Sequence, residues 1–162
     1  MCHAVIPGSF DPMTLGHLDI IKRARSHYDK VSVAVMINDA KSYLFSLEER
    51  LEIARLTLKK YPDVEVIGDR GMLVDLFDRI GADVIVKGVR NEQDRAYEEA
   101  MAKYNREKNP RAHTVFLEAA DDYEHLSSTK VRELLRCGAS LDGLIAADAL
   151  PYVMARFAEA KQ

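Results

Sequence analysis

Thr14 and His17 stand three residues apart where an expected strand gives way to an expected helix, within residues 6–18, which read IPGSFDPMTLGHL. Side chains with this spacing project from one face of a helix. A helix start carries free N–H groups and partial positive charge, which favour phosphate. An imidazole at that place can donate a hydrogen bond to a phosphate oxygen and stabilise charge as it develops. The alternative, which an isolated T-x-x-H would favour, is a threonine cap beside a partly exposed histidine.

Two more groups with the chemistry of a phosphate site come directly after expected strands. Gly8 lets the backbone approach a ligand closely, and Ser9 offers a hydroxyl and an N–H. Lys87 and Arg90 flank Gly88, so two cations would converge on one end of a sheet, where they suit a triphosphate and an acceptor phosphate. For these cations, an ordinary strand-to-helix turn with exposed charge is the alternative.

Residues 123–129, YEHLSST, place three consecutive hydroxyl groups before a strong helical pattern, KVRELL. Hydroxyls and free N–H groups at a helix start suit phosphate, and a simple cap needs only one of the three. His125 lies inside this segment, where it could contact a ligand, but a loop histidine is more often incidental. Lys41 follows another expected strand and would supply positive charge, with a solvated surface lysine as the alternative.

Short β-rich runs alternate with helical patterns along the chain, and this alternation predicts the scaffold. Strands are expected at residues 3–6, 31–37, 64–67, 83–86 and 114–117. Runs 31–37 and 83–86 are nearly continuous in apolar residues, as expected when both faces of a parallel sheet are covered. The sequence therefore predicts an α/β fold with a doubly wound, parallel, five-stranded sheet.

Amphipathic helices are expected between these strands. Ser46 and Glu49 form a capping box before one helix, Gly81 and Gly138 end two others, and a last helix follows Pro151. In such sheets, ligands bind beyond the carboxyl ends of the strands, where the strand order reverses. Those ends hold most of the unusual chemistry of this sequence, at residues 8–10, 38–41, 68–71, 87–90 and 121–129.

The composition suits one compact unit, and we expect a single domain over residues 1–162. A hydrophobic fraction of 48% allows a real core without disulfides or a structural metal. The net charge of −3, with no strongly basic half, argues against nucleic-acid binding by bulk attraction. The 2 cysteines form no disulfide framework, and neither a secretory signal nor a membrane-spanning run is evident, so we expect a cytoplasmic protein that engages no membrane.

Four motifs occur in order: GSFDPMTLGH, FSLEER, KGVRNEQD and LSSTKVREL. The first contains the H/T-x-G-H motif of the nucleotidyltransferase superfamily, and over nearly its whole length the chain resembles the bacterial phosphopantetheine adenylyltransferase family. The resemblance implies a Rossmann-like nucleotidyltransferase fold that transfers the adenylyl group of ATP to 4′-phosphopantetheine, normally with Mg²⁺. The products would be dephospho-coenzyme A and pyrophosphate, in coenzyme A biosynthesis. In-line attack on the α-phosphorus needs placement and charge stabilisation more than a protein nucleophile.

The same resemblance implies the site residues, position by position. His17 would be the catalytic residue, which stabilises the transition state. The acceptor would contact Ser9, Lys41, Leu73 and Lys87. ATP would contact Ser9, Phe10, His17, Gly88, Val89, Arg90, Glu98, Tyr123, Glu124, His125, Leu126, Ser127, Ser128 and Thr129. No protein ligand to the metal is assigned.

Three departures from the family pattern fall near this site. The family usually carries arginine where Lys87 stands. Lysine keeps the charge but loses the planar fork, so we expect acceptor affinity or geometry to differ while the reaction persists. Ser42 replaces a second lysine and removes one positive charge, and Arg95-Ala96 stands where the family commonly has Phe-Glu.

The helix expected around residues 97–104 carries two neighbouring stripes. Its apolar stripe consists of Tyr97, Ala100, Met101 and Tyr104, and beside it run Asp94, Glu98, Met101 and Asn105. Such a polar stripe is ordinarily the solvated face of a helix. The resemblance instead places Glu98 at ATP and Asn105 towards the pantetheine arm.

The resemblance further implies a homohexamer and feedback inhibition by coenzyme A. Two other functions stay open at this point. One is a nucleotidyltransferase of the same fold that acts on nicotinamide mononucleotide or a glycerol phosphate, against which YEHLSSTKVREL and the short chain argue. The other is a nucleotide-binding regulator without turnover, which would be expected to lack His17 or the cations.

Overall fold

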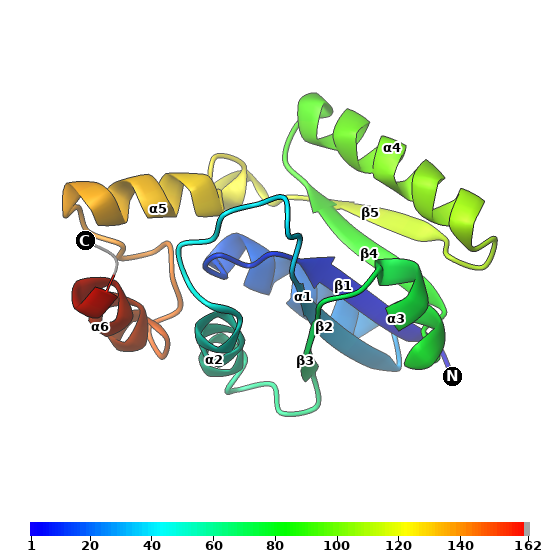
Figure 1. Ribbon diagram of the computed structural model, residues 1–162, viewed down its shortest axis with the longest axis horizontal. Coiled ribbons are helices and arrows are strands. Elements are labelled where there is room, and N and C mark those ends of the chain that lie inside the picture. Colours follow the sequence, from blue (N-terminus) through cyan, green and yellow to red (C-terminus); the bar gives the residue numbers. More distant parts are fainter. Residues whose placement is uncertain (161–162) are drawn as a thin grey trace.

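The computed structural model describes residues 1–160, which build a parallel five-stranded sheet in the order β3-β2-β1-β4-β5 (Figure 1). The α/β, doubly wound fold class expected from the sequence is confirmed. Within the described residues, no helix has the length and apolar character needed to span a membrane. The elements in chain order are β1 (His3–Gly8), α1 (Leu15–His27), β2 (Lys30–Met36), α2 (Leu47–Thr57), β3 (Glu65–Asp69), α3 (Leu73–Arg79), β4 (Val84–Val89), α4 (Glu92–Lys108), β5 (Thr114–Glu118), the 3₁₀ turn η1 (Asp121–Tyr123), α5 (Ser128–Cys137) and α6 (Leu150–Ala160).

The strand order reverses between β1 and β4. The chain runs outward from β1 through β2 to β3 and then returns to place β4 on the other side of β1. β1 pairs with β2 along its whole length, from His3 to Gly8, but with β4 only at Ala4 and Val5. The carboxyl-terminal halves of β1 and β4 are therefore unpaired with each other, and a ligand can enter the sheet at this point.

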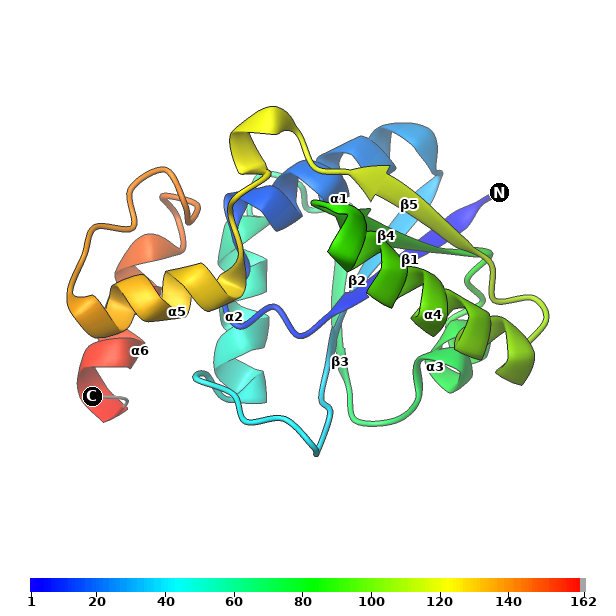
Figure 2. The ribbon, with the colours of Figure 1, turned by 90° about the horizontal axis from the view of Figure 1, so that it is seen from above.

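Different helices cover the two faces of the sheet, and α1 and α3 lie on opposite sides of the strands in Figure 2. On one face, Ile21 of α1 and Ile53 of α2 join Val33 and other buried strand residues in the larger core cluster. On the other face, Phe77 of α3 packs in a cluster with Ile85. Adjacent strand residues point to opposite faces, so the continuous apolar runs of β2 and β4 serve both clusters.

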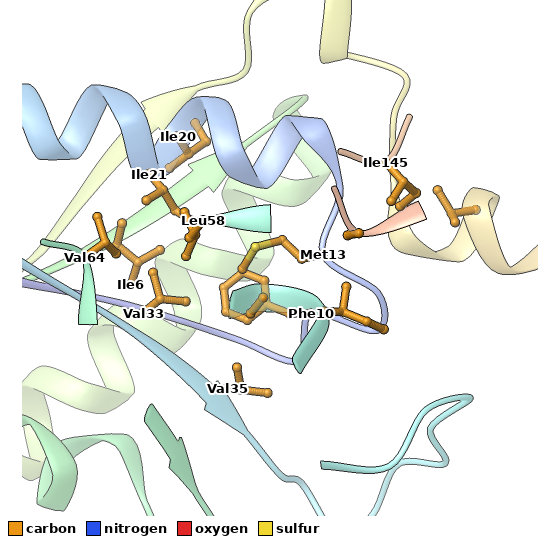
Figure 3. Packing of buried hydrophobic residues seen from close by; sticks show 14 of the residues in the cluster. Ile6, Phe10, Met13, Ile20, Ile21, Val33, Val35, Leu58, Val64 and Ile145 are labelled. Atoms are coloured by element: carbon orange, nitrogen blue, oxygen red, sulfur yellow. The ribbon is translucent and has the colours of Figure 1, made fainter. Parts of the chain in front are cut away.

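The loop after β1 is anchored by its apolar residues. Phe10 and Met13 are buried and point into the larger cluster among Ile6, Ile21 and Val35 (Figure 3). Phe10 and Met13 hold this loop in the core. Their packing therefore sets the positions of the polar residues that lie between and after them.

Three strands include residues that were expected to follow them, since β1 includes Gly8, β3 includes Gly68 and β4 includes residues 87–89. The expectation that these residues follow their strands is wrong. Glycine weakens strands and so indicates a strand end. In β4, however, packing requires it, because a Cβ on Gly88 would lie 2.9 Å from Cγ1 of Ile20. Gly88 thus lets α1 lie directly on β4.

Candidate active site

α1 begins with a reciprocal cap between Thr14 and His17. The Oγ1 of Thr14 accepts the His17 N–H at 3.3 Å, and the Thr14 N–H donates to Nδ1 of His17 at 3.0 Å. The Leu15 N–H donates to the carbonyl of Leu144 at 2.9 Å. Within the described residues, the N–H of Gly16, in the first turn of α1, has no hydrogen-bond partner in the protein.

His17 presents a neutral donor. Because its Nδ1 accepts the Thr14 N–H, the neutral ring carries its proton on Nε2. Burial, together with the positive charges of Lys87 and Arg90, lowers the pKa of His17 from 6.5 to about 4. The ring is therefore neutral at pH 7. One side chain serves as the helix cap and as a pocket residue, the two roles that the sequence set against each other.

Phe10 supports the ring of His17. The two ring centroids lie 5.0 Å apart in an edge-to-face arrangement with an interplanar angle of 84°. Phe10 has a φ of +48°, a region that residues other than glycine seldom occupy. A Cβ on Gly8 would lie 2.9 Å from Cζ of Phe10. The packing of Phe10 thus requires Gly8, which also lines both pockets, where the sequence predicted a close approach of the backbone to a ligand.

A first pocket, of about 310 Å³, opens at the carboxyl ends of β1 and β4. Glu124 and His125, which the resemblance placed at ATP, are exposed and line neither this pocket nor the second one described below. The other residues expected at ATP all line the first pocket: Ser9, Phe10, His17, Gly88, Val89, Arg90, Glu98, Tyr123, Leu126, Ser127, Ser128 and Thr129.

A second pocket, of about 560 Å³, lies beside the first. All four residues expected at the acceptor line it, namely Ser9, Lys41, Leu73 and Lys87. Much of the remaining wall is apolar, so the pocket suits an elongated ligand with an anionic end near the lysines. The apolar wall comes from Met36, Met72, Ile85, Tyr97, Met101, Ala102 and Tyr104. Five residues line both pockets: Pro7, Gly8, Ser9, Lys87 and Glu98.

α4 turns its polar stripe inward. Asn105 is only 9% exposed, and Glu98 lines both pockets, whereas Tyr97 and Tyr104 of the apolar stripe are 61% and 43% exposed. The ordinary interpretation of the polar stripe as a solvated face is wrong here. The second pocket lies beside this part of α4, and members of both stripes line it, Glu98 and Asn105 together with Tyr97, Met101 and Tyr104.

Both cations of the KGVR segment are held by carboxylates of α4. The Nζ of Lys87 lies 3.4 Å from Oε2 of Glu98. Arg90 donates from Nε to Oδ2 of Asp94 at 2.8 Å and from Nη2 to Oδ1 at 3.2 Å. An anionic ligand must therefore compete with Asp94 and Glu98 for these cations. The sequence did contain a signal for the Arg90–Asp94 pair, because the two residues have the i, i+4 spacing of helix neighbours.

The three hydroxyls at the start of α5 all have protein partners. Ser127 caps the helix, Ser128 donates to the Pro12 carbonyl at 2.7 Å, and Thr129 accepts from Nη2 of Arg132 at 3.1 Å. All three line the first pocket, and Ser128 also fastens α5 to the loop after β1. A ligand there would meet hydroxyls whose orientation is already set.

Sequence reasoning missed Arg132, which also lines the first pocket. Its Nη1 donates to the Asp11 carbonyl at 2.8 Å. The buried Asp11 carboxylate accepts the N–H groups of Leu44 and Phe45 at 2.8 and 3.0 Å. Arg132 stands inside the motif LSSTKVREL, so its place one turn after the hydroxyl cluster was the signal that could have found it.

Arg50 is fully buried, at 0% exposure, and bonds to the main chain of residues that line the pockets. Its guanidinium donates to the carbonyls of Ser9 at 2.8 Å, Met36 at 3.1 Å and Phe45 at 3.2 Å. Burial lowers the pKa of Arg50, an effect that the Asp11 carboxylate partly offsets. The side chain joins the end of β1, the end of β2 and the entry to α2.

The carboxylates of the first pocket do not make a resident metal site. Within residues 1–160, no group of three or more His, Cys, Asp or Glu side chains could hold an ion. Asp94 and Glu98 each face a cation, and Asp11 accepts backbone N–H groups. Mg²⁺ commonly binds through substrate phosphates, water and one or two carboxylates. This donor set therefore fits an ion that enters with a nucleotide better than one held by the protein alone.

The sequence of this chain is similar to those of known proteins. Residues 5–134 match the family model described as cytidylyltransferase-like. The phosphopantetheine adenylyltransferase of Symbiobacterium thermophilum is 49% identical over 145 residues, which cover 90% of this chain and 90% of that protein. That of Limosilactobacillus reuteri is 42% identical, over 90% of this chain and 84% of its own length.

A solved structure extends the likeness to the fold. The crystal structure of a candidate nicotinate-nucleotide adenylyltransferase from Vibrio parahaemolyticus matches with a TM-score of 0.75. The match covers 99% of this chain and 98% of that chain. At 18% sequence identity, it concerns the fold alone.

Proposed function

This chain belongs to the cytidylyltransferase-like family and, within it, to the phosphopantetheine adenylyltransferases, and on this premise we propose that it transfers the adenylyl group of ATP to 4′-phosphopantetheine. The products are dephospho-coenzyme A and pyrophosphate, which places the reaction in coenzyme A biosynthesis. The observation that supports this most is the meeting of two pockets along Ser9 and Lys87. A transfer between two bound substrates requires such a shared border.

In the proposed reaction, ATP occupies the first pocket and 4′-phosphopantetheine the second. Lys41 and Lys87 attract the acceptor phosphate, and Leu73 packs on the pantetheine arm. An oxygen of the acceptor phosphate attacks the α-phosphorus of ATP while the bond from that phosphorus to the bridging oxygen breaks, and pyrophosphate leaves. No protein nucleophile is needed, because the protein supplies placement and charge stabilisation.

His17 acts in this scheme through its Nε2–H. As negative charge builds on the α-phosphate, the neutral imidazole donates a hydrogen bond to a non-bridging oxygen. The Thr14 N–H holds the ring in the tautomer that makes this possible, and the edge of Phe10 limits its rotation. The Gly16 N–H offers a second donor from the same turn. A Mg²⁺ ion bound to the ATP phosphates would supply neutralisation of phosphate charge.

An assay of pyrophosphate release tests which molecule is the acceptor. With ATP and Mg²⁺, 4′-phosphopantetheine should trigger release, measured by a coupled enzymatic assay, whereas nicotinamide mononucleotide and glycerol 3-phosphate should not. Release with one of the latter two would instead identify a different transferase of this fold. ATP binding without release for any acceptor would support a regulator.

We also propose the remaining features that the resemblance implies: one domain over residues 1–162, a cytoplasmic location, a homohexamer and feedback inhibition by coenzyme A. Light scattering coupled to size exclusion should give six times the 18.3 kDa chain mass. Coenzyme A should inhibit pyrophosphate release, because it shares the pantetheine arm of the acceptor. A monomer in solution would contradict the assembly without affecting the proposed reaction.

A further inference from the structure

Lys87 and Glu98 form the charged part of the border between the two pockets. Of the five residues that line both pockets, they alone carry ionisable side chains. Lys87 belongs to β4 and Glu98 to α4, so the pair also bridges the sheet and the helix above it.

The side chains of Lys87 and Glu98 are close enough to attract each other, but their contact is long enough for a ligand to separate them. The Nζ of Lys87 lies 3.4 Å from Oε2 of Glu98 and 3.5 Å from the Pro7 carbonyl. The side chains are 24% and 19% exposed, so solvent screens their attraction only in part. Within the described residues, Glu98 has no second cation at salt-bridge distance.

The two members of the pair can each be taken by a different kind of ligand group. An ammonium only donates hydrogen bonds, so an acceptor phosphate in the second pocket can take Lys87 from Glu98. A carboxylate only accepts, so hydroxyl donors of a nucleoside in the first pocket can take Glu98 from Lys87. Whichever ligand arrives first opens the pair and leaves the other member free for the second ligand.

We propose that the Lys87–Glu98 ion pair couples the two pockets, so that a phosphorylated acceptor in the second pocket and a nucleotide in the first strengthen each other's binding. This inference rests on the proposed function. The free-energy cost of opening the pair falls only on the first ligand, and the coupling is reciprocal by linkage. Without the ion pair, the electrostatic interaction between two anionic ligands in adjacent pockets is repulsive, and neither ligand helps the other to bind.

Titration calorimetry with a non-transferable nucleotide measures this coupling directly. The Kd of adenosine 5′-(α,β-methylene)triphosphate is determined without and with saturating 4′-phosphopantetheine, and the ratio is the coupling factor. We expect a factor of about five in the unaltered protein. In Glu98→Gln the factor should fall to about one or below, because a neutral amide attracts Lys87 weakly.

Asp94→Asn is the matched control. It removes a carboxylate–cation pair one turn earlier on α4, but Asp94 and Arg90 line only the first pocket. This variant should change the nucleotide Kd and keep the coupling factor near five. Lys87→Arg, which preserves the charge opposite Glu98, should also retain the coupling. Lys87→Gln breaks the pair from the other side and should abolish it even if Glu98→Gln does not fold.

A factor of one in the unaltered protein, or an unchanged factor in Glu98→Gln or Lys87→Gln, would overturn the proposal. These results leave the proposed function standing as long as 4′-phosphopantetheine supports pyrophosphate release. If 4′-phosphopantetheine neither binds nor supports release, the proposed function and the coupling fall together.

Discussion

The imidazole of His17 caps α1 and, in the proposed reaction, is also the donor to the α-phosphate. Its Nδ1 closes the cap of α1, and this bond leaves the proton on Nε2. Burial and two nearby cations keep the ring neutral at pH 7. A neutral N–H donor is ready to meet growing charge without first losing or gaining a proton, which is the state that electrostatic preorganisation requires.

Replacing His17 should therefore affect the chemical step more than the fold. In His17→Ala we expect kcat to fall by about 100- to 1,000-fold, the effect typical of removing one donor to a transition-state oxyanion. Steady-state pyrophosphate release measures kcat, and circular dichroism reports the fold. His27→Ala, at the exposed last turn of the same helix, is the control and should leave kcat unchanged. A His17→Ala enzyme with near-normal turnover would exclude the stabilising role.

The segments around the pockets are held together by two arginines that donate to main-chain carbonyls. Arg50 ties the ends of β1 and β2 to the entry of α2, and Arg132 ties α5 to the loop after β1. These bonds are made to main-chain carbonyls, so they position the backbone of the loops. Loops at the ends of parallel strands have no ladder partners, and such cross-links replace them.

Arg50→Lys should loosen this arrangement. One ammonium cannot reproduce the planar fork that reaches three carbonyls, so buried acceptors lose their donors. We expect a loss of about 2 kcal/mol in the free energy of unfolding, measured by urea denaturation, together with a lower kcat as Ser9 and Phe10 shift. Arg55→Lys, an exposed position on the same helix, should change neither quantity. Equal stability of the two variants would argue against the cross-link.

The stability of the whole molecule should depend on pH because the imidazole of His17 is buried. The unfolded chain protonates His17 near its ordinary pKa of 6.5, but the folded protein does so only near 4. As pH falls through this window, protons bind preferentially to the unfolded state, so the contribution of His17 to stability declines and then levels off below about pH 4. The corresponding contribution is about 3 kcal/mol.

Urea denaturation of the ligand-free protein between pH 7 and 4 tests this prediction. The unaltered protein should lose stability relative to His17→Gln, which has no proton to bind at this position. Parallel curves for the two proteins would show that His17 titrates normally. The same experiment checks the proposed single domain, because one domain should unfold in one cooperative transition that fluorescence and circular dichroism report alike.

Much of the fold could be predicted because its signals are local. The apolar runs of β2 and β4, the capping box of Ser46 and Glu49, and the left-handed Gly138 at the end of α5 each depend on neighbours within a few residues. Such short-range physics is written in the order of the side chains. The end of β4 was misplaced because Ile20, the residue whose packing requires Gly88, is distant in the sequence and acts through space.

The sequence was enough to indicate the fold class, the family and, through the resemblance that its motifs carry, many of the residues that line the two pockets. The carboxyl ends of parallel strands meet at one edge of the sheet, which is where those motifs lie. Only the tertiary structure decided which charges meet. It paired Lys87 with Glu98, buried Arg50 among three carbonyls and turned the polar stripe of α4 inward. A periodic pattern states which residues share a face of a helix, but what that face meets depends on how distant elements pack, and here it meets open pockets rather than the sheet.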